Sequence, residues 1–152
     1  MIRVAAVLAA LAAAASAAAA TGVRWSPLAT GATEPNGSQL PEGYVAGTRA
    51  QERPWLARLQ GDDRRALARV NLSTTDVIAV FLDGLPCASK VAVTGVTRSQ
   101  RTLTVDVTYK RPPIGVATCV RTSTEYYLLA ARRSSLGRPL PTRVDVVARA
   151  RA

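Results

Sequence analysis

The sequence contains no histidine in 152 residues, which excludes the commonest catalytic and metal-binding chemistry. Ser-His-Asp and Cys-His hydrolysis both require an imidazole, and so do most zinc sites. Phosphate-binding glycine motifs of the P-loop or dinucleotide type are also absent. Because the chain has only ten carboxylates, catalysis by paired acids would need scattered residues such as Asp83, Asp106 and Glu125. We therefore expect a protein that is not an enzyme and that uses no metal or cofactor.

Long apolar runs are absent after the first twenty residues, so no later segment predicts a membrane span. The N-terminus has a positive start, an Ala-rich apolar stretch and small residues typical of a secretory signal peptide. We predict cleavage after Ala20, with Ala17 as the alternative site. A retained signal anchor is the less favoured interpretation, because an alanine-rich run is only weakly hydrophobic.

Residues 1–20 are thus a predicted signal peptide, and residues 21–150 a single exported β-rich domain. We expect the protein to be secreted or extracytoplasmic, in the periplasm or cell envelope, with no membrane span after cleavage. About 130 residues are enough for one hydrophobic core and too few for two domains of ordinary size. We expect this domain to be a monomer.

Cysteine is scarce, with Cys87 and Cys119 the only two. An even number in an exported chain indicates a disulfide bond. Closing a loop of about 33 residues would stabilise the fold by roughly 3–4 kcal/mol in the chain-entropy model. Two unpaired thiols or a redox pair are the alternatives, and the absence of a C-x-x-C motif argues against the second.

Acidic residues are outnumbered two to one, which gives a formal net charge of +10. The arginines are scattered rather than clustered, and the chain has a single Phe and no basic motif rich in aromatics. Specific nucleic-acid binding is therefore not expected. A basic surface attracts acidic proteins or anionic polymers by its long-range field, and we expect a protein partner.

Two short helices are predicted in the first half of the chain. Residues 51–59 form the first, with Pro54 in its first turn and Trp55, Leu56 and Leu59 on one face. Asp62 is the predicted N-cap of the second, residues 63–70, whose inward residues are Ala66, Leu67 and Val70. Helix capping explains the neighbouring Asp62 and Asp63 better than a catalytic pair does.

Strand patterns dominate the rest of the chain. Residues 77–82 are almost continuously apolar, which predicts a strand buried on both faces. Residues 90–97 and 102–110 alternate and predict a hairpin. Further strands are expected at 23–26, 44–48, 116–122, 124–131 and 144–147, with loops at 31–41 and 132–142. The predicted fold is mainly β (α+β), an antiparallel sheet forming a small sandwich or open barrel, with one or two short helices before the core strands.

This order of segments resembles the PrcB family of bacterial exported proteins, in particular the PrcB-like C-terminal domain. The matching segments are Trp55-Leu56, residues 77–84, Pro86, residues 91–97, residues 103–107, Arg111-Pro-Pro113 and Glu125-Tyr-Tyr127. The family turn commonly reads T-G-G-Y where this chain has Cys87-Ala-Ser-Lys90. The resemblance implies a non-catalytic accessory domain, named for a subunit found with a surface protease.

Three functions follow from these observations. The first is an exported binding or accessory domain that associates with a protease or envelope protein. The second is a small β-sandwich protease inhibitor. The third is an unrecognised enzyme acting on an anionic surface polymer through arginines such as Arg98, Arg101, Arg111 and Arg121. The contact loops predicted for the first two functions contain Leu85, Pro86, Arg111, Pro112, Pro113 and Ile114.

Overall fold

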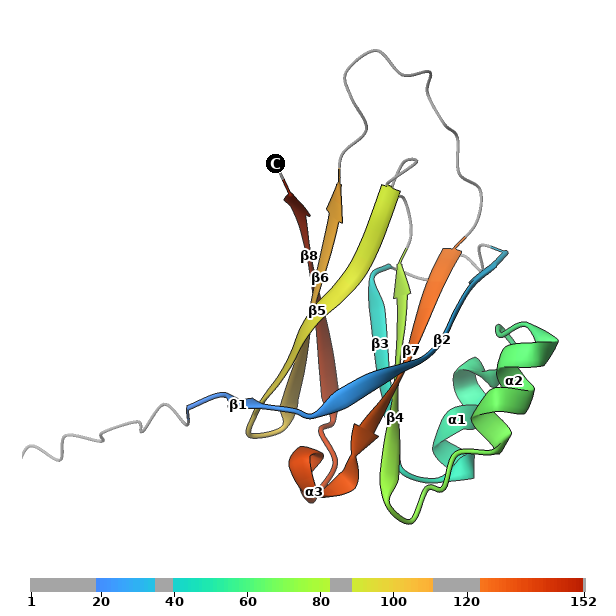
Figure 1. Cartoon of the computed structure of the whole chain (residues 1–152). Coiled ribbons are helices and arrows are strands. Elements are labelled where there is room, and N and C mark those ends of the chain that lie inside the picture. The colour runs from blue at the N-terminus through green and yellow to red at the C-terminus, as the bar shows by residue number, and fades with distance from the viewer. Residues whose placement is uncertain (1–18, 35–39, 83–88, 111–123, 152) are drawn as a thin grey trace, which may run out of the picture.

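Two four-stranded β-sheets face each other in the computed structural model, which describes residues 19–34, 40–82, 89–110 and 124–151 (Figure 1). Two helices cover the outer face of one sheet, and a third, shorter helix lies at one end of the sandwich. The predicted mainly-β sandwich is confirmed, and in the described part of the chain the sheets do not close into a barrel. The strands thus form two layers, and the helices add a third on one side.

The first sheet has the strand order β1-β5-β6-β8. These strands are β1 (Thr21–Gly22), β5 (Ser89–Ser99), β6 (Thr102–Lys110) and β8 (Arg143–Arg151). The predicted hairpin is confirmed as the antiparallel pair β5–β6, while β8 pairs with β6 in parallel. Leu103, Val105 and Val107 point inward from β6, so this sheet presents an alternating apolar face to the other.

The second sheet has the order β2-β7-β4-β3, and all of its neighbours are antiparallel. Its strands are β2 (Trp25–Thr33), β3 (Glu42–Ala46), β4 (Thr75–Leu82) and β7 (Thr124–Arg132). Because β4 is central and covered on both sides, its residues must be apolar on both faces, as the sequence predicted. Ile78 and Val80 enter the core between the sheets, whereas Val77 and Phe81 enter the core beneath the helices.

The two helices before β4 differ in detail from the prediction. Helix α1 (Arg49–Leu56) begins two residues earlier and ends three residues sooner than expected, so Pro54 lies inside it rather than in its first turn. The Thr48 side chain accepts from the Gln51 N–H and caps the start. Trp55 and Leu59 are fully buried and Leu56 packs beside them, which confirms the predicted apolar face.

Helix α2 (Gly61–Ala68) begins and ends two residues earlier than predicted. Its N-cap is Gln60, so Asp62 is not the cap, and Asp62 and Asp63 both lie in the first turn. Carboxylates there still interact favourably with the positive end of the helix dipole. Leu67 is buried, and Ala66 and Val70 are half-buried on the same side.

Three local predictions around the strands were wrong. Residues 31–33, expected in a loop, continue β2 because they pair with β7. The segment expected to be a loop at residues 132–142 contains helix α3 (Arg133–Leu136), which ends at Gly137 with φ of 74°. The last strand is longer than expected and, being parallel to β6, needs the crossover that β7 and α3 supply. The strand expected at residues 116–122 lies outside the described residues.

One side of the sandwich is closed and the other is open. On the closed side β3 lies against β8, and Gly43 allows the close approach of Val144. On the other side the chain crosses between the layers, since β1 pairs with β5 and β2 then pairs with β7 (Figure 1). The sequence signal for a single strand at residues 23–26 corresponds to this crossing. The candidate functional site lies on this open side.

Candidate functional site

An apolar cleft of about 250 Å³ lies on the open side, between the two sheets. Strands β2, β5 and β7 supply its walls, so residues distant in sequence meet there. Trp25, Val91, Val93, Tyr127 and Leu129 also pack against the core between the sheets, and the cleft is therefore a place where this core reaches solvent. The lining residues are Trp25, Pro27, Thr30, Val91, Ala92, Val93, Tyr127 and Leu129. We call this site the open-side cleft.

Strand β5 borders the cleft with a largely unpaired outer edge. Among the described residues, β1 pairs with this edge at Thr97 and Arg98, and the Val23 N–H donates to the Val96 carbonyl at 2.9 Å. The chain then leaves β5, and Trp25 pairs with Ala131 of β7. Residues 91–95 consequently have no neighbouring strand on this side in the described part of the chain. An open edge of this kind is a template for another strand.

Strand β2 borders the same cleft from the second sheet, but its edge is less suited to pairing. The register of β2 with β7 is irregular between Pro27 and Ala29, and β5 has comparable shifts in its register with β6. Pro27 lacks an N–H, and proline is typical of edge strands that resist the addition of a partner strand. The two edges that face the cleft are therefore not equivalent.

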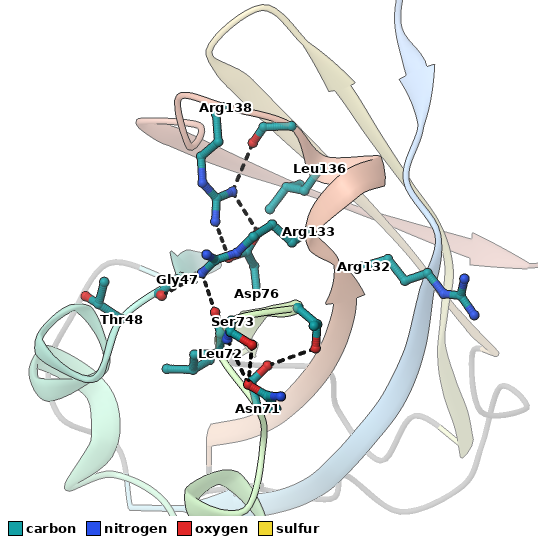
Figure 2. Close-up of polar contacts among 12 residues, drawn as sticks. Gly47, Thr48, Asn71, Leu72, Ser73, Asp76, Arg132, Arg133, Leu136 and Arg138 are labelled. Atoms are coloured by element: carbon teal, nitrogen blue, oxygen red, sulfur yellow. Dashed lines mark hydrogen bonds and ion pairs between the residues drawn. The ribbon is translucent and has the colours of Figure 1, made fainter.

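A second, polar recess of about 260 Å³ adjoins the cleft at Trp25. Arg24, Ser26, Ala130 and Arg132 line it together with Trp25. Both arginines are exposed, and Figure 2 shows Arg132 pointing away from the neighbouring ion-pair cluster. Positive charge thus lies beside one end of an apolar surface, which suits a ligand that has an acidic group next to apolar ones.

A buried carboxylate, Asp76, forms ion pairs at the start of β4, and the residues of this cluster do not line the cleft (Figure 2). Asp76 is fully buried, and Arg138 donates to both of its carboxylate oxygens at 2.8 and 2.9 Å. The hydrogen bond with Asp76 raises the pKa of the Arg138 guanidinium. Arg133 lies 3.4 Å from the same carboxylate and donates to the Gly47 and Leu72 carbonyls. This cluster joins α3 and the segment after it to the start of β4, which is a structural role.

Tyr126 makes a second buried polar contact, beneath helix α2. Its hydroxyl donates to the Asp63 carboxylate and accepts from the Gln60 N–H at 3.1 Å. Burial, together with the hydrogen bond to Asp63, raises the pKa of Tyr126 to about 12. The arrangement ties the start of α2 to β7. It also explains Asp63 better than catalysis does, since its acceptor oxygen faces a buried phenol.

Arg58 packs over the Phe81 ring at 3.7 Å and forms an ion pair with Glu42 at 2.7 Å. Tyr44 also contacts Phe81, with the two rings nearly perpendicular, and burial raises the pKa of the Tyr44 phenol. The cation–π contact and the ion pair fasten the end of α1 to β3 and β4. This cluster is likewise a connection between elements.

The residues that the sequence singled out as a site lie outside the described residues. They are the predicted disulfide partners Cys87 and Cys119 and the contact-loop residues Leu85, Pro86, Arg111, Pro112, Pro113 and Ile114. The structure therefore leaves these predictions as they stood. The open-side cleft was missed, because Val91, Val93 and Tyr127 carry the alternating pattern of ordinary core residues.

The carboxylates considered for catalysis do not converge where they are described. Asp106 lies on the outer face of the first sheet and forms an ion pair with Arg149 at 3.2 Å. Glu125 comes from the second sheet and accepts from the Tyr127 hydroxyl at 3.1 Å. Asp83 lies outside the described residues. Of the neighbouring tyrosines, Tyr126 is fully buried and belongs to the core beneath the helices.

Arg98, considered for polymer binding, is engaged within the fold. Its guanidinium donates to the carbonyls of Gln100, Leu136 and Pro139, which fastens the end of β5 to the segment around α3. Arg101 is exposed, and its carbonyl accepts from the N–H groups of Thr142 and Arg143. Arg111 and Arg121 lie outside the described residues.

Within residues 19–34, 40–82, 89–110 and 124–151, no group of three or more Cys, Asp or Glu residues is arranged to hold a metal ion. No helix in this part of the chain combines the length and apolar character needed to cross a bilayer. The sequence and the structure match no protein-family model, no curated protein and no solved structure.

Proposed function

We propose that this protein is an exported, non-catalytic binding domain whose open-side cleft receives a partner protein. The observation that carries the proposal is that apolar side chains of the inter-sheet core, among them Trp25, Val93 and Tyr127, line a cleft open to solvent. Exposed apolar concavities of this kind usually serve interaction, because leaving them in water is unfavourable.

The chemistry around the cleft favours binding over turnover. Its polar side-chain groups are the Thr30 hydroxyl, the Trp25 indole N–H and the Tyr127 phenol, and the phenol already donates to Glu125. General acid–base catalysis needs a titratable group within reach of the substrate, and the described lining offers no carboxylate, lysine or cysteine. The resemblance to the PrcB family is in keeping with an accessory domain, and it favours an extracytoplasmic protease as the partner.

Site-specific photo-crosslinking tests this proposal. Thr30 is exposed and lines the cleft, so a benzoyl-phenylalanine placed there should crosslink to one discrete partner in the native exporting host. Arg53, exposed on α1, is the matched control position. A crosslink from position 30 that is absent from position 53 supports the proposal. Equal crosslinking from both positions, or none from position 30, would contradict it.

A further inference from the structure

The outer edge of β5 and the open-side cleft lie side by side. Together they form a place where one additional strand would fit. Val91 and Val93 supply apolar side chains to the cleft from the same stretch of β5 that lacks a neighbouring strand in the described part of the chain. An extended segment placed there would satisfy backbone groups along one edge and bury alternate side chains on one face. These are the two components of recognition by strand addition.

We propose that residues 91–95 of β5 accept an extended segment of the partner protein as an added antiparallel strand. This inference rests on the proposed function and specifies how the cleft is used. The occupant is a segment with apolar residues at alternate positions, because successive side chains of a strand point to opposite faces and one face meets the cleft.

The existing ladder sets the direction of the added strand. β1 runs antiparallel to β5, and its last contact is the hydrogen bond between the Val23 N–H and the Val96 carbonyl. A segment that continues this ladder begins near Gly95 and runs toward Val91. Its N-terminal end therefore lies nearest to Trp25, which also borders the polar recess.

Charge at that end specifies the partner further. Arg24 and Arg132 line the recess, and the whole chain carries a net charge of +10. An acidic residue just before the first apolar position of the segment would meet these arginines. The expected ligand is thus an extended segment with an acidic N-terminal flank followed by alternating apolar residues.

The β2 edge is the competing place for such a segment, and its geometry argues against it. Pro27 has no N–H to donate, which would leave a gap in a backbone ladder along that edge. The outer edge of β5 contains no proline between residues 89 and 99. Both strands have shifts in the register with their inner neighbours, β5 with β6 and β2 with β7, so the missing N–H of Pro27 is what distinguishes the two edges.

Backbone N-methylation of a synthetic peptide tests the proposal without altering the protein. The probe is Asp-Val-Thr-Val-Thr-Val-Thr, titrated into the unsubstituted protein by calorimetry. In one version every Val is N-methylated, and in the other every Thr, so each version removes the N–H groups from one edge of the peptide. Because alternate N–H groups point to opposite sides, only one set faces β5. Each lost backbone hydrogen bond weakens binding several-fold, so we expect the two versions to differ at least about tenfold in Kd.

Equal Kd values for the two methylated versions would overturn strand addition, and so would no detectable binding of the unmodified probe. A protein variant separates this result from failure of the proposed function. Val93→Asp puts a charge into the cleft, and its folding is checked by circular dichroism. If it abolishes the crosslink from position 30 while the methylated probes bind equally, the cleft is used but not through strand addition.

Discussion

Asp76 is a residue at which a small chemical change should strongly lower the stability of the fold. Its carboxylate is fully buried and satisfied by Arg138 and Arg133, so Asp76→Asn leaves two guanidinium groups without their counter-charge. We expect a loss of about 3 kcal/mol in the free energy of unfolding, measured by urea denaturation. Asp145→Asn is the control, because the Arg143–Asp145 pair is exposed and its loss should stay within about 0.5 kcal/mol. Equal effects of the two substitutions would contradict the structural role of the cluster.

Tyr126 makes the stability of the fold depend on pH in the alkaline range. Its pKa is raised to about 12, from an ordinary value of 10, mainly by burial and secondly by the hydrogen bond to Asp63. The folded state therefore holds the phenolic proton more tightly than the unfolded state does. The resulting stabilisation is complete below about pH 10 and is lost as the pH rises toward 12.

The test compares the protein with its Tyr126→Phe variant. The variant should be less stable by about 1–3 kcal/mol at neutral pH, because the Gln60 N–H and the Asp63 carboxylate lose their partner. The difference in unfolding free energy between the two proteins should shrink between pH 10 and 12. Tyr44 also has a raised pKa, but it is present in both proteins and cancels. A difference that stays constant across this range would refute the assignment.

At the scale of elements, the contact between β3 and β8 closes one side of the sandwich. A methyl group added at Gly43 would lie 2.8 Å from the Cβ atom of Val144 and nearer still to one of its methyl groups. Gly43→Ala should therefore force the two strands apart and cost about 1–3 kcal/mol in thermal or urea unfolding. Gly22→Ala is the matched control, since nothing lies within 4 Å of the added methyl group. If both substitutions were neutral, the two strands would not be in contact as described.

The elements themselves were largely predictable, because their patterns are local. The apolar run of β4, the alternation of β5 and β6 and the Trp55 face of α1 each have one dominant periodicity. The ends of the helices were less predictable. Thr48 and Gln60 both precede the segments in which apolar residues recur, so the first turns contribute little pattern of their own. The parallel pairing of β8 with β6 could not be predicted, since it depends on which edge remains free after the other strands have paired.

At the scale of the whole molecule, the cleft could not be predicted from the sequence. Trp25, Val93 and Tyr127 come from three strands, and each has the pattern of a residue with one buried face. What exposes them is the crossing of the chain from β5 to β7 between Val23 and Trp25. The point at which the chain stops pairing with β5 and begins to pair with β7 depends on the arrangement of both sheets, and no local pattern in the sequence encodes it.

The disulfide between Cys87 and Cys119, which would link distant parts of the molecule, stays a prediction. Intact-mass measurement of the natively exported protein should give a value two hydrogens lighter than after reduction, and it should also locate the signal cleavage site. Reduction should lower the free energy of unfolding by roughly 3–4 kcal/mol, since it releases a loop of about 33 residues. Free thiols in the exported protein would rule out the bridge and weaken the expectation that the chain is exported.

Amide hydrogen exchange tests the central claim most directly, because it reports on individual backbone groups of β5. The protein is compared with and without saturating Asp-Val-Thr-Val-Thr-Val-Thr. The account predicts that exchange slows at outward-facing amides within residues 91–95, while α1 and α2 on the far face of the second sheet are unchanged. Protection confined to the helices, or no added protection between residues 91 and 95 at saturation, would show that the open edge is not where this protein binds.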